Sequence, residues 1–315
     1  MSQTISTTKT ALLARGNNDS ASNKEKQPLP KSQLSQQYGG HHAGGWVDLF
    51  PTSWLSRLSP PTAFFMVFAP HLFGAIHAAA THHLPLSSVA RVGSYLLSGS
   101  FFFSNAAHAW NDLVDAPIDA QIARTKTRPI PRGAISPKAA FLFTCVQAAC
   151  AAVFLLPLPW DATLAAVATI VGTTYYPFAK RHTHFAQFVL GLCLKWGVMV
   201  GSAGMGVPAP WRDPSTATLV AASVVWMVIF DTIYADQDLA DDLRVGVKST
   251  AVLFGSWARP ILFGLYLTMS ALLVASGYWG GICWTWFSRG FWPTGAAIAA
   301  GLLVEYGWQQ MVGLA

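Results

Sequence analysis

Long apolar stretches that recur along most of the chain constrain its fold more than any other feature. Crossing about 30 Å of hydrocarbon takes roughly 20 apolar residues in a helix. A segment of that length must also satisfy its own backbone hydrogen bonds in lipid, which an α-helix does. Eight stretches qualify, at residues 61–82, 90–110, 138–157, 161–178, 184–204, 216–235, 259–279 and 291–306. We therefore predict an all-α fold, a polytopic membrane helix bundle with about eight transmembrane helices.

The composition agrees with a membrane protein and argues against a nucleic-acid-binding one. Hydrophobic residues make up 52% of the chain and charged residues only 11%. The sequence pI is about 9.2. The basic residues, however, lie in short loops between apolar stretches and form no continuous patch. We expect membrane lipid as a partner and no nucleic acid, and nothing in the sequence indicates an oligomeric state.

The N-terminal segment differs from the rest of the chain. Residues 1–45 are rich in Ser, Thr, Gln, Asn and Lys, which predicts a disordered polar tail ahead of a transmembrane domain at residues 46–315. The tail has no apolar core of the secretory type. Its Arg content is too low, and its Lys and acidic residues are too mixed, for a mitochondrial presequence. These features favour the endoplasmic reticulum or another intracellular membrane over the mitochondrial inner membrane.

The loop charges predict the orientation of the bundle. The loops after the second, fourth and sixth stretches hold ten Lys and Arg residues, whereas the other loops hold only Arg91, Arg212 and Arg289. Basic loops face the cytoplasm in most membrane proteins. We therefore expect these three loops on the cytoplasmic side.

Acidic residues are concentrated at the ends of two apolar stretches. Eight of the fourteen fall into two windows, Asp112, Asp115 and Asp119 in the first, and Asp231, Asp236, Asp238, Asp241 and Asp242 in the second. A carboxylate costs roughly 2.5 to 3.5 kcal/mol at the bilayer centre and less toward the interface. Such clusters therefore require cations close by.

Helical periodicity predicts that each cluster has one common face. At about 100° per residue, the three carboxylates of the first cluster fall within about 60° of one another, provided that the helix continues through Pro117. In the second cluster, Asp231, Asp238 and Asp242 fall within about 40° of one another on a helix, with Tyr234 nearby and Asp236 turned away. Both clusters then present several carboxylates in one direction.

Two helices with aligned carboxylates form an oxygen-ligand site suited to Mg²⁺, which usually keeps water and substrate phosphate as further ligands. Basic residues that suit phosphate oxygens follow each cluster or close the fourth stretch, namely Arg124, Arg128, Lys180, Arg181 and Lys248. The sequence thus predicts a site for Mg²⁺ and a diphosphate. The alternative interpretation is ordinary solvated charges at the membrane interface.

Three motifs carry a family resemblance. Residues 111–119, NDLVDAPID, resemble the NDxxDxxxD motif of the UbiA superfamily of intramembrane prenyltransferases, and residues 124–130 resemble the basic stretch that follows it. Residues 231–242 match the DxxYAxxDxxxD motif, and residues 246–250 its usual continuation. Residues 176–181, YPFAKR, are similar to the YPxxKR sequence that ends the fourth helix. The resemblance covers about residues 50–310.

This resemblance implies a Mg²⁺-dependent aromatic prenyltransferase of the 4-hydroxybenzoate polyprenyltransferase-like branch, which includes fungal meroterpenoid enzymes. Such an enzyme transfers a farnesyl or similar group from an isoprenoid diphosphate to a phenolic acid, polyketide or pyrone. The catalytic carboxylates would be Asp112, Asp115, Asp238 and Asp242. The metal ligands would be these four with Asn111, Asp119 and Asp231. Cofactor and diphosphate binding would involve Asn111, Arg124, Arg128, Lys180, Arg181, Tyr234 and Lys248.

Two departures from the family pattern bear on substrate choice and on the fold. Many relatives carry Arg-x-Asp-Lys-Pro before the first helix, where this chain has Arg57-Leu58-Ser59-Pro60-Pro61. The resemblance also implies nine helices, against eight candidate stretches. Three alternative functions stay open. They are a membrane terpene cyclase acting on farnesyl diphosphate, a 4-hydroxybenzoate polyprenyltransferase of the ubiquinone pathway, and a non-catalytic transporter or scaffold.

Overall fold

The computed structural model describes residues 62–282, which form α-helices joined by short 3₁₀ turns and loops. The all-α prediction is therefore confirmed for this part of the chain. The predicted tail at residues 1–45, the segment from Arg57 to Pro61 and the apolar stretch 291–306 lie outside the described residues.

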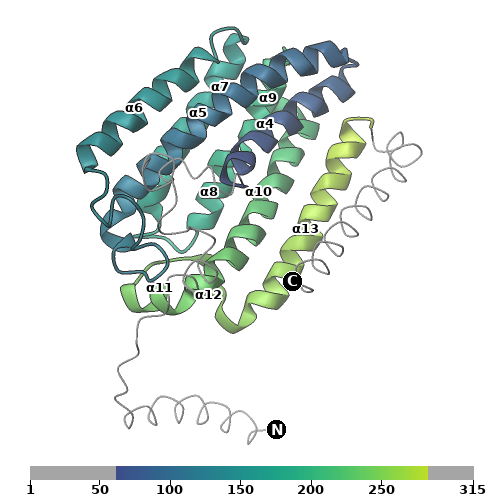
Figure 1. Ribbon diagram of the computed structural model, residues 1–315. Coiled ribbons are helices and arrows are strands. Elements are labelled where there is room, and N and C mark those ends of the chain that lie inside the picture. Colours follow the sequence, from purple (N-terminus) through teal and green to yellow (C-terminus); the bar gives the residue numbers. More distant parts are fainter. Residues whose placement is uncertain (1–61, 283–315) are drawn as a thin grey trace, which may run out of the picture. The chain divides into compact units, whose positions relative to one another are not determined.

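Each of the seven predicted stretches within the described part corresponds to helical structure (Figure 1). The helices are α4 (Thr62–Thr81), α5 (Leu86–Asp119), α6 (Pro137–Val153), α7 (Trp160–Ala179), α8 (Ala186–Lys195), α9 (Gly197–Gly204), α10 (Pro214–Ala235), α11 (Leu239–Val245), α12 (Thr250–Phe254) and α13 (Ala258–Trp279). Among the described residues, four segments are long and apolar enough to cross a membrane, Ala63–Thr81, Ala186–Gly204, Pro214–Val245 and Thr250–Trp279. Several membrane-length helices are thus present, and the total of eight stays a prediction.

Local sequence signals explain where several helices begin. Pro214 and Pro137 are the first residues of α10 and α6, where a missing N–H costs nothing. The carboxylate of Asp213 accepts hydrogen bonds from the backbone N–H groups of Ser215 and Thr216, at 3.4 and 2.8 Å, and so caps α10. The predicted stretch 184–204 differs from expectation because it is two helices that meet at Trp196.

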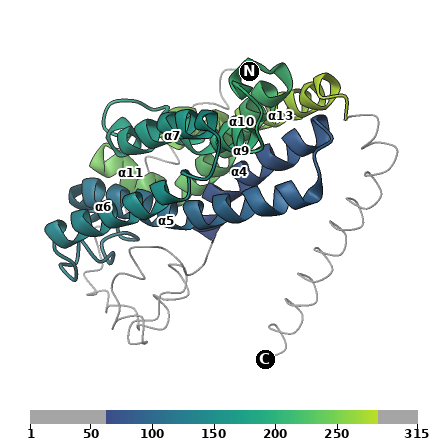
Figure 2. The same cartoon turned by 90° about the horizontal axis from the view of Figure 1, so that it is seen from above.

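Glycine allows α4 and α9 to pack with their backbones in contact. A Cβ atom on Gly74 would lie 1.9 Å from the carbonyl oxygen of Val198, and one on Gly201 would lie 1.9 Å from that of His71. Any larger residue at either position would force the helices apart. Elsewhere α5 lies beside α6, and α10 beside α13, in both views (Figures 1 and 2).

The connections after α5, α7 and α10 meet at one end of these helices. The backbone N–H of Lys248 donates to the carbonyl of Lys180 at 3.1 Å. The Arg244 guanidinium donates to the carbonyl of Gln121 at 2.8 Å. Figure 1 shows α11 and α12 at this end. All three sequence motifs are therefore brought to the same end of the bundle.

Candidate active site

The first acidic cluster lies on one continuous helix. α5 passes through Pro117 and ends at Asp119, as the predicted common face requires. Asp112, Asp115 and Asp119 are 1%, 2% and 5% exposed. Three buried carboxylates on one helix need compensation, and each of them has a basic partner.

Arg128 compensates two of these carboxylates. The loop after α5 folds back on the helix, with the Thr125 hydroxyl donating to the Asp119 carbonyl at 3.0 Å. This places Arg128 Nη1 at 3.1 Å from Asp112 Oδ1 and 2.6 Å from Asp119 Oδ2. Burial disfavours the charged guanidinium, but the two carboxylates outweigh burial and raise the pKa of Arg128 above its ordinary value. The side chain is therefore a permanent cation.

Lys180 compensates the third carboxylate from a different helix. It follows the last residue of α7, and its Nζ lies 2.8 Å from Asp115 Oδ2 and 4.8 Å from the centroid of the Tyr176 ring. The other Asp115 oxygen, Oδ1, and Asn111 Oδ1 are both buried and have no hydrogen-bond partner within the described residues. Two adjacent oxygen atoms with free lone pairs are suited to ligate a cation.

The second acidic cluster does not lie on one continuous α-helix, so that part of the prediction is wrong. α10 ends at Ala235, residues Asp236–Asp238 form a 3₁₀ turn, and α11 follows. Asp has low helix propensity because its side chain competes for backbone groups, which favours a break at this acidic sequence. Asp236 is exposed on this turn, whereas Asp242 is 6% exposed.

The carboxylates of the second cluster nevertheless gather near the first. Asp231 and Asp242 both interact electrostatically with Lys180, the partner of Asp115, and Asp242 interacts with Asp238. Lys180 is thus the common cation between the clusters.

Arg124 links the first basic stretch to the second acidic motif. Its Nε lies 3.0 Å from both oxygens of Asp238, and its Nη2 lies 2.5 Å from Asp238 Oδ2. The guanidinium carbon is 5.4 Å from the centroid of the Tyr234 ring. Burial disfavours the charge of Arg124, but the hydrogen bonds to Asp238 outweigh burial and raise the pKa of the guanidinium.

The remaining predicted basic residues bind backbone carbonyls. Arg181 Nη2 lies 2.7 Å from the Val114 carbonyl oxygen, and Lys248 Nζ lies 3.3 Å from that of His182. Asp241 accepts from the Ala123 backbone N–H at 3.0 Å and so holds the loop after α5. These contacts shape the end of the bundle around the paired charges.

The side chains fit Mg²⁺ that is shared with a diphosphate better than a metal held by protein alone. In the described range 62–282, no three His, Cys, Asp or Glu side chains converge on one position. The carboxylates pair with Arg124, Arg128 and Lys180 instead. Mg²⁺ at phosphate sites usually takes only one or two carboxylates and completes its shell with water and phosphate oxygens. The free oxygens of Asn111 and Asp115 fit that requirement.

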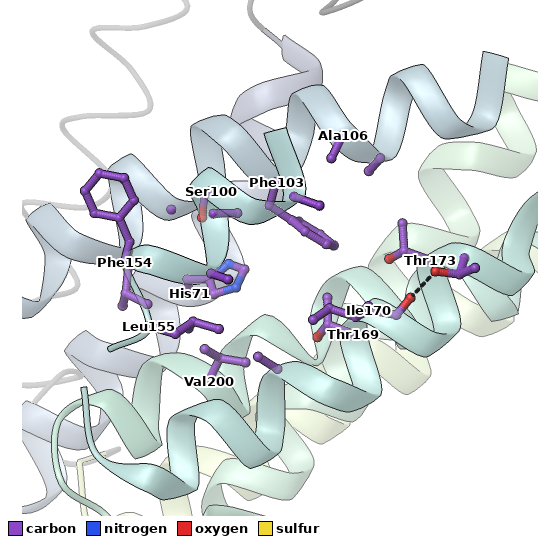
Figure 3. A pocket seen from close by; sticks show the side chains of 18 of the residues that line it. His71, Ser100, Phe103, Ala106, Phe154, Leu155, Thr169, Ile170, Thr173 and Val200 are labelled. Atoms are coloured by element: carbon purple, nitrogen blue, oxygen red, sulfur yellow. Dashed lines mark hydrogen bonds between the residues drawn. The ribbon is translucent and has the colours of Figure 1, made fainter. Parts of the chain in front are cut away.

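An apolar cavity of about 260 Å³ lies next to the first cluster, between α4, α5, α6, α7 and α9. Its lining on α5 extends from Tyr95 to Trp110, about 22 Å along the helix axis. In Figure 3 Phe154, Leu155 and His71 lie toward one end and Ala106 and Thr173 toward the other. At this second end the Trp110 indole donates to the Thr174 carbonyl at 3.0 Å. Trp110 directly precedes Asn111, the first residue of the first motif. The cavity therefore leads to the acidic cluster.

None of these lining residues was predicted from the sequence. Small residues on facing helices make the space, and they are Gly99, Ala106, Ala107, Ala148, Ala151, Ala152 and Ala166. The spacing of these small residues is visible in the sequence. The apolar stretches contain many other small residues, however, and helix packing decides which of them face one another.

A model of the UbiA prenyltransferase family matches residues 60–312, which is most of the chain and includes every motif described above. The chain belongs to the UbiA prenyltransferase family. It is 35% identical over 246 residues to a prenyltransferase of Stachybotrys bisbyi named stbC, which covers 75% of this chain and 74% of that protein. It is 33% identical to the mitochondrial 4-hydroxybenzoate polyprenyltransferase of Schizosaccharomyces pombe, covering 75% of this chain and 67% of that protein.

A solved structure has the same fold. The UbiA homolog from Archaeoglobus fulgidus, bound to GPP and Mg²⁺, superposes with a TM-score of 0.54 over 76% of this chain and 88% of that chain. Its sequence identity to this chain is 16%. The two chains thus share a fold at low sequence identity.

Proposed function

We propose that this UbiA-family protein transfers a farnesyl or similar prenyl group from an isoprenoid diphosphate to an aromatic acceptor in meroterpenoid-type biosynthesis. One observation carries the proposal. Carboxylates from two motifs more than 100 residues apart form ion pairs with basic residues at one end of an apolar cavity, as Asp115 does with Lys180 and Asp238 with Arg124. Paired charges beside a long apolar space suit a substrate with a diphosphate head and a hydrocarbon tail.

The buried polar groups would bind the diphosphate. Asn111, Asp112, Asp115, Asp238 and Asp242 would hold Mg²⁺, with Asp119 and Asp231 in support. Bound Mg²⁺ would stabilise the negative charge of the departing diphosphate. The Mg²⁺ in the homologous A. fulgidus structure supports this assignment.

The basic side chains would receive the phosphate oxygens. Arg124 and Arg128 present guanidinium groups that suit bidentate phosphate binding, and Lys180 adds a point charge between the clusters. Their positions are already fixed by carboxylates, so little reorganisation is needed when the allylic C–O bond breaks. The buried site keeps water from the allylic cation.

The prenyl chain would occupy the apolar cavity, and an electron-rich ring carbon beside a phenolic hydroxyl would attack the allylic carbon and then lose its proton. The 4-hydroxybenzoate specificity in the name of the S. pombe relative supports an aromatic acceptor. We place the enzyme in the endoplasmic reticulum or another intracellular membrane, with the basic loops on the cytoplasmic side.

Product analysis tests the proposal. Microsomes that contain the protein are incubated with farnesyl or geranylgeranyl diphosphate and a panel of phenolic acids, polyketides and pyrones, with Mg²⁺ or with excess EDTA. We expect prenylated aromatic products that require Mg²⁺. Release of a terpene hydrocarbon without any aromatic would show a cyclase instead. Activity that survives EDTA would contradict the metal assignment.

A further inference from the structure

One buried cation has no role in the diphosphate site. Lys195, the last residue of α8, is 1% exposed. Its Nζ donates to the Met66 carbonyl at 3.3 Å and lies 4.5 Å from the centroid of the Trp226 ring. Within residues 62–282 no Asp or Glu forms an ion pair with it. An ionisable side chain at membrane depth without a counter-ion is costly and commonly marks a functional site.

Aromatic side chains connect Lys195 to the diphosphate site. Trp226, Phe230 and Tyr234 follow one another at every fourth residue of α10. The ring centroids are 6.0 Å apart in the first pair and 6.4 Å in the second, where the planes differ by 10°. The three side chains are 38%, 39% and 43% exposed, so their surfaces are accessible.

This aromatic row has a cation at each end. Arg124 lies over the Tyr234 ring at 5.4 Å, and Lys195 lies over the Trp226 ring at 4.5 Å. From Trp226 to Tyr234 the helix advances about 12 Å. Arg124 is already assigned to the diphosphate, whereas two of the three ammonium protons of Lys195 have no hydrogen-bond acceptor among the described residues. An anionic group at the far end of the row would meet a cation with free donors.

We propose that Lys195 and the aromatic row Trp226, Phe230 and Tyr234 form the acceptor site, and that Lys195 recognises a carboxylate on the aromatic acceptor. The row supplies faces on which an aromatic ring stacks. Lys195 supplies the charge-assisted hydrogen bond that distinguishes an aromatic acid from a neutral phenol. The side chain can lean toward the diphosphate site, because helical side chains point toward the N-terminus and α8 begins at that end. This inference rests on the proposed prenyl transfer.

A matched pair of acceptors tests the role of Lys195. The wild type and the Lys195→Met and Lys195→Arg variants are given a phenolic acid and the same phenol without its carboxyl group. We expect Lys195→Met to raise KM for the acid about 10- to 100-fold, the loss typical of a charge-assisted hydrogen bond. KM for the phenol and for farnesyl diphosphate should stay unchanged, and arginine should restore acid recognition. Lys138→Met, at an exposed lysine in the first turn of α6, is the control.

Equilibrium binding of the radiolabelled phenolic acid to purified protein in nanodiscs, without prenyl diphosphate, separates this inference from the proposed function. Binding lost in Lys195→Met and kept in Lys195→Arg supports the acceptor site even if no product forms. Lys195→Gln keeps a donor for the Met66 carbonyl but has no charge. It should therefore also lose binding of the acid, and it replaces Lys195→Met as the test if that variant folds poorly. Equal affinity of the wild type and both neutral variants, or equal loss for acid and phenol, would overturn the inference.

Discussion

The Arg124 guanidinium and the Asp238 carboxylate form a bidentate contact, with Nε at 3.0 Å from both oxygens, across 114 residues of sequence. The pair joins the loop after the first acidic motif to the turn inside the second. Each group is held in place by the other before any substrate binds. When a diphosphate and Mg²⁺ enter, we expect Arg124 to bind phosphate and Asp238 to bind the metal.

Arg124 should therefore matter more than its neighbours in the same junction. We expect Arg124→Met to reduce kcat/KM for the prenyl diphosphate about 10²- to 10³-fold, because a preorganised cation at the leaving group is lost. Arg244 contacts the exposed side of this junction through Asp241 and Gln121. Arg244→Met should therefore change kcat/KM for the prenyl diphosphate by less than about threefold. Steady-state assays in microsomes at several donor concentrations measure both. Equal losses in the two variants would show that Arg124 only supports the loop.

Substitution of Asp115 or Asp238 should reduce turnover far more than substitution of Asp236. Asp115→Ala and Asp238→Ala should abolish turnover and leave membrane insertion intact, because each removes a carboxylate of the diphosphate site. Asp236 is exposed on the 3₁₀ turn, so Asp236→Ala should cause only a mild loss. Product formation and membrane-fraction immunoblots of all three variants test this. Wild-type turnover in either of the first two would disprove the metal assignment.

Ala166 on α7 should limit the length of the prenyl chain. It lines the cavity and is 8% exposed, so Ala166→Phe would fill part of the space. We expect the ratio of kcat/KM for farnesyl over geranyl diphosphate to fall about tenfold or more, since overpacking of this kind costs about 1–3 kcal/mol. Val167 is 50% exposed and is not part of the lining, which makes Val167→Phe the control. An unchanged ratio in Ala166→Phe would place the prenyl chain elsewhere.

Asp213 should make the start of α10 sensitive to acid. Burial raises the pKa of this carboxyl, but hydrogen bonds from Thr216 and Ser215 outweigh burial and lower the pKa below its ordinary value. Its stabilising effect is complete above the unfolded pKa and is lost as the pH falls through the folded one. Asp213→Ala should cost about 1 kcal/mol at pH 7.

Thermal unfolding of the purified protein between pH 3 and 7 measures this effect. The stability gap between the wild type and Asp213→Ala should narrow below pH 4. Asn is also a good N-cap but does not titrate, so the gap between Asp213→Asn and Asp213→Ala should stay constant with pH. If the stability difference between the wild type and Asp213→Ala does not change with pH, the carboxylate does not act through its charge.

Periodicity and composition alone predicted the helices, because a long apolar stretch in lipid has few other ways to satisfy its backbone. They also placed Asp112, Asp115 and Asp119 on one face, since a single helix fixes that geometry. In the second motif a short 3₁₀ turn at Asp236–Asp238 changes the helical phase, so the predicted common face of that motif was wrong. Helical phase cannot be carried across such a break.

The sequence by itself determined the fold class, the family motifs and the two clusters of charge. Only the tertiary structure decided which charges meet, as in Arg124 with Asp238 and Lys180 with Asp115, because partners from different helices are fixed by packing. It also created the cavity and placed Lys195 over Trp226. Lys195 was not singled out from the sequence, although it is the one Lys or Arg between residues 184 and 204. Its burial against an aromatic ring depends on how α4, α8 and α10 pack together, which no local pattern encodes.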